Sequence, residues 1–207
     1  MRGMAAPLVD RRPDGHIRRI ESADPAAIDD ATVGPYGPPP LPLQPTKISP
    51  ISGSMPLNDL VAPNAVLPAL KVNSKKQAIQ ELAARAAKLT GQSERSIFET
   101  LLQREKLGST GIGAGIAIPH GKIGKLEKLF GLFARLDRPV DFDALDGQPV
   151  DLVFVLLAPE AAGADHLKAL ARIARLLRDP DIARKLRDSR DAGALYAVLT
   201  LPPPAAA

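Results

Sequence analysis

The chain has 207 residues and a formal net charge of +4, and 45% of its residues are hydrophobic while only 3% are aromatic. This length accommodates one ordinary domain plus an appendage, and the apolar fraction is sufficient for a core. The small, dispersed charge and the shortage of aromatic side chains for base stacking argue against a nucleic-acid partner. The sequence contains no cysteine. This excludes a disulfide framework, thiolate chemistry and a zinc–thiolate site, and it is compatible with a cytoplasmic location.

No stretch of the sequence predicts membrane insertion. The longest apolar run, residues 152–158, is far shorter than the roughly 20 residues that a spanning helix needs. The N-terminus lacks a secretory pattern, because Pro7 interrupts a brief apolar stretch.

Residues 1–54 differ in composition from the rest. They hold ten of the 21 prolines, and their six basic residues balance six acidic ones. We expect a disordered or polyproline-like extension. It is either a proline-rich docking tail or, the reading we favour, an inert extension or the result of placing the start codon too early, with Met55 as the true start. The folded domain is then expected at residues 55–201, followed by a frayed tail at 202–207.

The first half of this domain is expected to hold two extended segments followed by two helices. Their ranges are, in order, residues 57–61, 65–70, 74–90 and 93–107. Ser74, with Gln77 three residues later, forms a capping-box pattern, and Gly91 is a typical helix end. The helix pair is also compatible with a helix-turn-helix, but it lacks a basic recognition face and is better explained as a packing unit.

The second half is expected to contain two strands and then three helices. The strands lie at 129–136 and 152–157, and the second is apolar throughout, as in a central strand buried on both faces. Asp165 is expected to cap a long helix that ends at Asp179-Pro180, with five residues facing the core: Leu167, Leu170, Ile173, Ala174 and Leu177. Shorter helices follow at 182–186 and 191–199. The pattern predicts a single layered α/β (α+β) domain with a mixed β-sheet flanked by helices.

A glycine-rich segment joins the two halves. Residues 108–122 read GSTGIGAGIAIPHGK and contain one of only three histidines, His120. Glycines let the main chain approach a ligand closely, and Pro119 prevents a continuing helix. We expect an irregular loop that presents the imidazole as a nucleophile or general base. The alternative is an ordinary surface or core histidine.

Two common glycine-rich motifs do not fit this segment. A dinucleotide-binding GxGxxG starting at Gly111 needs a glycine where Ile116 stands, and no Gly-Lys-Ser/Thr follows as in a P-loop. What remains is a set of backbone N–H groups, the hydroxyls of Ser109 and Thr110, and one imidazole. This set suits a small anion, with phosphate the leading candidate.

Arg104-Glu105-Lys106 followed by this segment resembles the active-site signature of the phosphotransferase-system IIA components of the mannitol/fructose class, and most closely the nitrogen-related branch, IIA-Ntr. A second block, FDALDGQPVDL at 142–152, and a third, Asp165-His166-Leu167, are similar to later motifs of that family. The resemblance covers roughly residues 56–200 and implies a layered α/β fold of that class.

The resemblance implies roles for individual residues. His120 corresponds to the phosphoryl acceptor, charged from phosphoenolpyruvate through enzyme I and an HPr-like carrier. Arg104 corresponds to the arginine beside the site, and a guanidinium fork suits phosphate. His166 corresponds to a second histidine near the site, although a packed helix-start histidine is an equal alternative. Four residues are expected to contact the phosphate: Ser109, Thr110, Gly111 and Gly121. Neither a metal site nor a cofactor is expected.

Three functions are compatible with these observations. The first is a regulatory phosphocarrier with a phosphohistidine intermediate, which binds unidentified proteins differently in its two states. The second is a sugar-transport IIA that donates to a separate IIB protein. This chain cannot serve as that IIB itself, because the IIB acceptor of this class is a cysteine. The third is a binding module that is never phosphorylated, against which the pairing of His120 with Arg104 argues.

Overall fold

The computed structural model describes residues 57–200, so the predicted tails at 1–54 and 202–207, and Met55 as a start, lie outside the described residues. The elements in chain order are β1 (Val61–Leu70), α1 (Lys75–Thr90), α2 (Glu94–Lys106), β2 (Gly111–Gly113), β3 (Ile116–Ala117), β4 (His120–Ile123), β5 (Phe130–Val140), β6 (Val150–Pro159), α3 (Gly163–Arg178), α4 (Pro180–Asp188) and α5 (Ala192–Thr200).

The strands form one mixed sheet in the order β1-β5-β6-β3-β2, and β4 also pairs with β6. β6 runs antiparallel to β5 but parallel to β3 and β4. Residues 152–158 of β6 are all buried, which confirms the prediction of a central strand covered on both faces. The mixed sheet flanked by helices is the predicted fold class.

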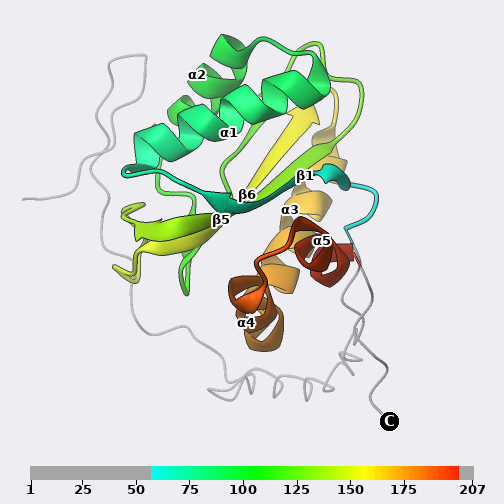
Figure 1. Ribbon diagram of the computed structural model, residues 1–207. Helices are drawn as coiled ribbons and strands as arrows, with labels where there is room; N and C mark the ends of the chain where they lie inside the picture. Colours follow the sequence, from blue (N-terminus) through cyan, green and yellow to red (C-terminus); the bar gives the residue numbers. More distant parts are fainter. Residues whose placement is uncertain (1–56, 201–207) are drawn as a thin grey trace, which may run out of the picture. The chain divides into compact units, whose positions relative to one another are not determined.

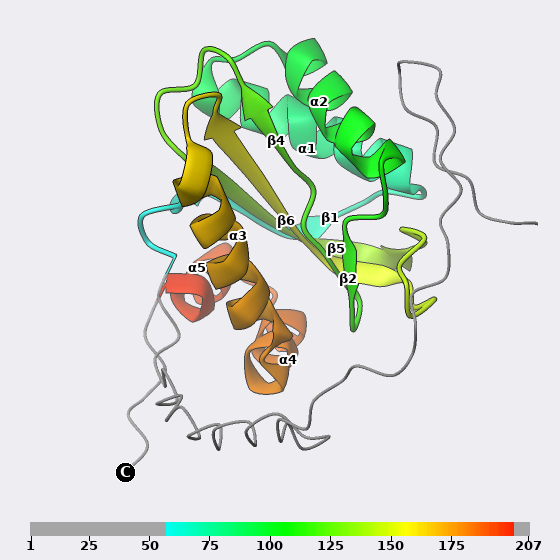
Figure 2. The ribbon, with the colours of Figure 1, turned by 180° about the vertical axis from the view of Figure 1, so that it is seen from behind.

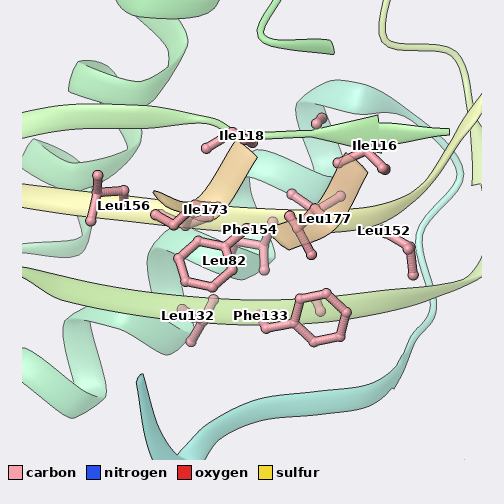
Figure 3. Packing of buried hydrophobic residues seen from close by; sticks show 14 of the residues in the cluster. Leu82, Ile116, Ile118, Leu132, Phe133, Leu152, Phe154, Leu156, Ile173 and Leu177 are labelled. Atoms are coloured by element: carbon pink, nitrogen blue, oxygen red, sulfur yellow. The ribbon is translucent and has the colours of Figure 1, made fainter. Parts of the chain in front are cut away.

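Helices cover both faces of the sheet. α1 and α2 lie on one face, and α3, α4 and α5 lie on the other (Figures 1 and 2). Side chains of β5 and β6 pack against α1 on one face and α3 on the other (Figure 3). Phe133 and Phe154 form a cross-strand pair, and both are fully buried. The helix pair of the first half packs as a unit, and no helix within residues 57–200 has the length and apolar character to cross a bilayer.

The predicted caps of α1 are confirmed. The Ser74 hydroxyl accepts a hydrogen bond from the backbone N–H of Gln77 at 3.2 Å, and Gly91 ends the helix with a φ of 70°. The reciprocal half of the capping box is shifted by one residue, since Gln77 Oε1 accepts from the N–H of Asn73. The capping residues therefore predicted both ends of this helix correctly.

Two local expectations are wrong. The separate extended segments at 57–61 and 65–70 are replaced by a turn and a single strand, β1, which lies at the edge of the sheet and, among the described strands, pairs only with β5. Prolines interrupt an edge strand less than a central one, because one side of it needs no ladder donors. Asp165 does not cap α3, which begins two residues earlier with Ala162 at the N-cap and no side-chain cap. Leu167, expected in the core, is 68% exposed.

Candidate functional site

His120 is placed by the central strand of the sheet. β3 and β4 both pair in parallel with β6, and the two residues between them, Ile118 and Pro119, continue along the same edge. The Pro119 carbonyl accepts a hydrogen bond from the Leu156 N–H at 3.0 Å. His120 is therefore the first residue of β4, opposite Leu156. The expectation of an irregular loop at this position is wrong, because β6 supplies hydrogen-bond partners that the local sequence does not reveal.

The hydrogen bonds of the His120 ring define one neutral tautomer. Nδ1 lies 2.8 Å from the Ile118 carbonyl oxygen, and Nε2 lies 3.1 Å from Nε of Arg104. A carbonyl only accepts and a guanidinium only donates, so Nδ1 carries the hydrogen and Nε2 keeps its lone pair. The more basic atom of the ring, Nε2, is thus the one that faces the arginine. The side chain is half-buried.

Arg104 reaches His120 from the last turn of α2. Its Nη1 donates to the Gly108 carbonyl at 2.9 Å, just beyond the helix end, which fixes the guanidinium while Nε points at the imidazole. Among the described residues no acceptor pairs with its Nη2. A phosphoryl group at Nε2 of His120 would therefore meet a planar donor array suited to its oxygens.

His166 approaches the same ring from the first turn of α3. The centroids of the His120 and His166 rings are 5.6 Å apart in an edge-to-face arrangement. His166 is buried, and its Nε2 has no hydrogen-bond partner within residues 57–200. A buried polar atom without a partner is costly. Three residues singled out from the sequence, His120, Arg104 and His166, are thus brought together.

Both ring pKa values lie below the ordinary value of 6.5. Burial is the main cause of the lowered pKa of His120, with the nearby Arg104 charge acting in the same direction; the hydrogen bond to Ile118 and the Glu105 charge oppose them. Burial also dominates the lowered pKa of His166, followed by the charges of His120 and Lys122. Both rings are therefore neutral at pH 7.

This lowering predicts a loss of stability in acid. Well above pH 6.5 both rings are largely neutral in the folded and the unfolded chain. As the pH falls from 6.5 towards the folded-state pKa values, the unfolded chain binds protons more readily, so the free energy of unfolding decreases. NMR titration of the ring C–H resonances should give midpoints below 6.5 for both histidines. A midpoint at or above 6.5 would contradict the assignment of two desolvated rings.

The hydroxyls of Ser109 and Thr110 are engaged with the protein. The Ser109 hydroxyl donates to the Phe142 carbonyl at 2.6 Å, and that of Thr110 donates to a carboxylate oxygen of Glu105. Contact of either hydroxyl with a phosphate stays a prediction, and it requires these bonds to be exchanged.

Close packing explains why glycine is needed at both positions that the sequence assigned to phosphate contact, Gly111 and Gly121. A Cβ added at Gly121 would lie 2.4 Å from Cγ2 of Thr100, and one at Gly111 would lie 2.8 Å from Cβ of Ala144. A phosphate-binding role for Gly111 and Gly121 stays a prediction. No group of three or more acidic or histidine side chains within residues 57–200 is arranged to hold a metal ion.

Sequence reasoning missed the residues behind the site. Glu105 is only 5% exposed, and it lies between Arg104 and the glycine-rich segment. Its carboxylate pairs with Lys75, thirty residues away at the start of α1. A signal was available, because an acidic residue in the last turn of a helix opposes the helix dipole and needs a compensating partner.

The chain is similar to known proteins in sequence and in fold. The family model for the phosphoenolpyruvate-dependent sugar phosphotransferase system, EIIA 2, matches residues 59–201. A nitrogen regulatory protein of Bradyrhizobium diazoefficiens is 78% identical over 153 residues, covering 74% of this chain and 100% of that protein. The fructose-specific EIIABC component of Bacillus subtilis is 33% identical over 146 residues, covering 70% of this chain but only 23% of that protein.

Solved structures also match the described fold. The nitrogen regulatory protein IIA-Ntr of Neisseria meningitidis aligns with a TM-score of 0.66 at 37% identity, covering 69% of this chain and 97% of that one. The IIA mannitol protein of Escherichia coli aligns with a TM-score of 0.59 at 20% identity, covering 67% and 98% of the two chains. At that identity the second match concerns the fold alone.

Proposed function

Because the chain belongs to the EIIA type 2 family of the phosphotransferase system, whose members are phosphocarriers, we propose that it is a nitrogen-related regulatory phosphocarrier that accepts a phosphoryl group on His120. The proposed donor is an HPr-like carrier charged from phosphoenolpyruvate, and the proposed location is the cytoplasm. Proteins of this family interact with phosphocarrier partners. The proposed regulated partners are proteins that bind one phosphorylation state of the chain more tightly than the other.

The observation that carries the proposal is the fixed tautomer of His120. Nε2 holds a lone pair at pH 7, since Nδ1 carries the hydrogen and donates to Ile118. The Arg104 Nε–H that donates to this lone pair in the free protein moves onto a phosphoryl oxygen; attack by Nε2 then forms a nitrogen–phosphorus bond while the donor's bond to phosphorus breaks, and Nδ1 keeps its proton. The positive charge that develops on the ring is then stabilised by the Ile118 carbonyl.

Arg104 and His166 supply the electrostatic part of the proposed transfer. Phosphoryl transfer depends mainly on alignment and on neutralising charge over three equatorial oxygens. The Arg104 guanidinium lies within hydrogen-bond distance of the accepting nitrogen. The unpartnered Nε2 of His166 supports a role as a hydrogen-bond donor to a phosphoryl oxygen, with the ring in its Nε2–H tautomer.

Phosphorylation of His120 would change which proteins bind the surface around it, and this supports a regulatory role. It adds about −1.5 to −2 charges at pH 7 to a half-exposed position. A partner that buries the neutral surface around His120 is repelled by that charge, and a partner with an arginine cluster is attracted.

The test is phosphorylation of the full chain by phosphoenolpyruvate, enzyme I and the HPr-like carrier, followed by intact mass measurement. We expect an acid-labile mass gain in the wild type and in the control His16→Ala, and none in His120→Ala. If the carrier becomes phosphorylated but the wild-type chain does not, the protein is no phosphocarrier.

A second experiment separates regulation from sugar transport, the alternative that the likeness to a fructose-specific component favours. The phosphorylated chain is mixed with sugar-specific IIB proteins of the same organism, and transfer is followed by mass. We expect the phosphate to remain on the chain. Rapid transfer to one IIB would instead favour a transport role.

A further inference from the structure

Glu105 is a buried acid at an unfavourable place. It lies in the last turn of α2, where the helix dipole disfavours a negative charge, yet it is only 5% exposed. Its side chain is held from two sides. Lys75 Nζ lies 3.3 Å from Oε1, and Oε2 accepts hydrogen bonds from both the backbone N–H and the hydroxyl of Thr110. The donors to this carboxylate thus come from one residue of the glycine-rich segment, Thr110, and from one lysine, Lys75.

Thr110 connects this carboxylate to the imidazole. While its N–H is held by Glu105 at 3.0 Å, its carbonyl accepts from the N–H of Ile118 at 2.9 Å. The Ile118 carbonyl in turn accepts from Nδ1 of His120. The chain of bonds from Glu105 ends on the atom that sets the tautomer of the ring.

A second connection runs to the arginine. Gly108 donates its N–H to the Glu105 carbonyl at 3.2 Å and offers its own carbonyl to Nη1 of Arg104. The Glu105 carboxylate holds Thr110 at the end of the turn 108–110, and the Gly108 carbonyl at its start binds the guanidinium. The position of this turn therefore determines the position of the Arg104 guanidinium. Lys75 anchors the assembly to the β5–β6 connection, since it also pairs with Asp143 at 2.6 Å.

We propose that Glu105, anchored by Lys75, is a positioning residue for phosphoryl transfer: it clamps Thr110, and through Thr110 and Gly108 it sets the orientation of His120 and Arg104. This inference rests on the proposed function, because it assigns a residue to that same transfer. Glu105 touches neither the phosphoryl group nor the reacting nitrogen.

A structural role alone makes a different prediction. Replacing a buried ion pair with apolar side chains of similar size often leaves stability unchanged or raised. The double variant Lys75→Met/Glu105→Met leaves no unpaired buried charge, but it removes the clamp and leaves the N–H and hydroxyl of buried Thr110 without their acceptor, so it should fold with some loss of stability. Glu105→Gln removes the charge but retains a side-chain oxygen that accepts from Thr110, so the hydrogen bonds to Thr110 should be preserved in this variant.

The experiment measures two quantities on wild type, E105Q, E105M and K75M/E105M, with D151N as a matched control. Asp151 forms a partly buried bidentate pair with Arg187 on α4, outside this network. The first quantity is kcat/KM for phosphoryl transfer from the carrier. The second is the tautomer of His120 from ¹⁵N chemical shifts, which needs no donor.

For K75M/E105M we expect a folded protein with a lowered Tm, a fall in kcat/KM of about 10- to 100-fold measured well below that Tm, and a mixture of His120 tautomers. E105Q and D151N should keep the wild-type tautomer and most of the transfer rate. Wild-type transfer and a single tautomer in K75M/E105M would overturn the inference, as would an equal loss in E105Q. Should E105M fail to fold, the double variant carries the test. Absence of transfer to the wild type itself would contradict the proposed function, while the tautomer measurement still judges Glu105.

Discussion

Replacing Arg104 with alanine is expected to slow phosphoryl transfer to His120 by about 10²- to 10³-fold, the usual cost of removing one preorganised donor from a charge-developing site. Arg104 Nε lies 3.1 Å from the accepting Nε2, so its loss removes both alignment of the ring and neutralisation of the phosphoryl oxygens. The measurement is the single-turnover rate of transfer from the phosphorylated carrier.

Arg104→Lys should recover only part of this loss, since an ammonium cannot reproduce the planar fork of a guanidinium. Arg95 provides a matched control on the same helix, because its side chain is 87% exposed and, within residues 57–200, pairs only with Glu99 one turn away. Arg95→Ala should transfer at the wild-type rate. Equal rates for Arg104→Ala and Arg95→Ala would remove Arg104 from the reaction.

Phe154→Ala is expected to lower the free energy of unfolding by about 3–5 kcal/mol. The ring is fully buried on the central strand β6, faces Phe133 across the β5–β6 pair and lies against Gly131. Alanine at this position leaves a cavity between the sheet and the helices packed on it, and the hydrogen-bonded strands prevent the surrounding side chains from filling it completely. Urea-induced unfolding measures the change.

Phe130 is the matched control for this substitution. It lies in β5, only partly buried at the edge of the core. Phe130→Ala should cost clearly less than Phe154→Ala, because less apolar surface returns to water and solvent fills the space. Equal losses from the two substitutions would contradict the placement of the core beneath β6.

The parts of the fold that sequence predicted well are those with a strong local signal. The continuous apolar run at 152–157 identified β6, because a strand covered on both faces needs apolar residues in every position. Ser74 and Gly91 marked both ends of α1 through their capping chemistry. β3 and β4 could not be found in this way, since strands of two and four residues are too short to show periodicity.

The errors in α3 have a packing cause. Its buried residues are His166, Ala169, Ile173, Leu176 and Leu177. The expected set included Leu167, which belongs to the neighbouring face and is exposed. Only one narrow stripe of this helix meets the sheet, and the leucines around it do not reveal which stripe it is.

The site itself required more than sequence spacing. His120 was noticed from its own surroundings in the sequence, but its contact with Arg104, sixteen residues earlier, came from the resemblance and is now seen as a hydrogen bond. Glu105 and Lys75 are joined by tertiary structure alone. From the sequence, the only indication was an acidic residue in the last turn of a helix, which needs a compensating partner if it is buried.

The most direct test of the central claim, that the fold presents Nε2 of His120 as the phosphoryl acceptor, is ³¹P and ¹⁵N NMR of the phosphorylated, ¹⁵N-histidine-labelled chain. We predict a single phosphohistidine with phosphorus coupled to Nε2 of His120, while Nδ1 keeps its proton and its bond to Ile118. A phosphoryl group on Nδ1 of His120, on His166 or on any other residue would contradict the account.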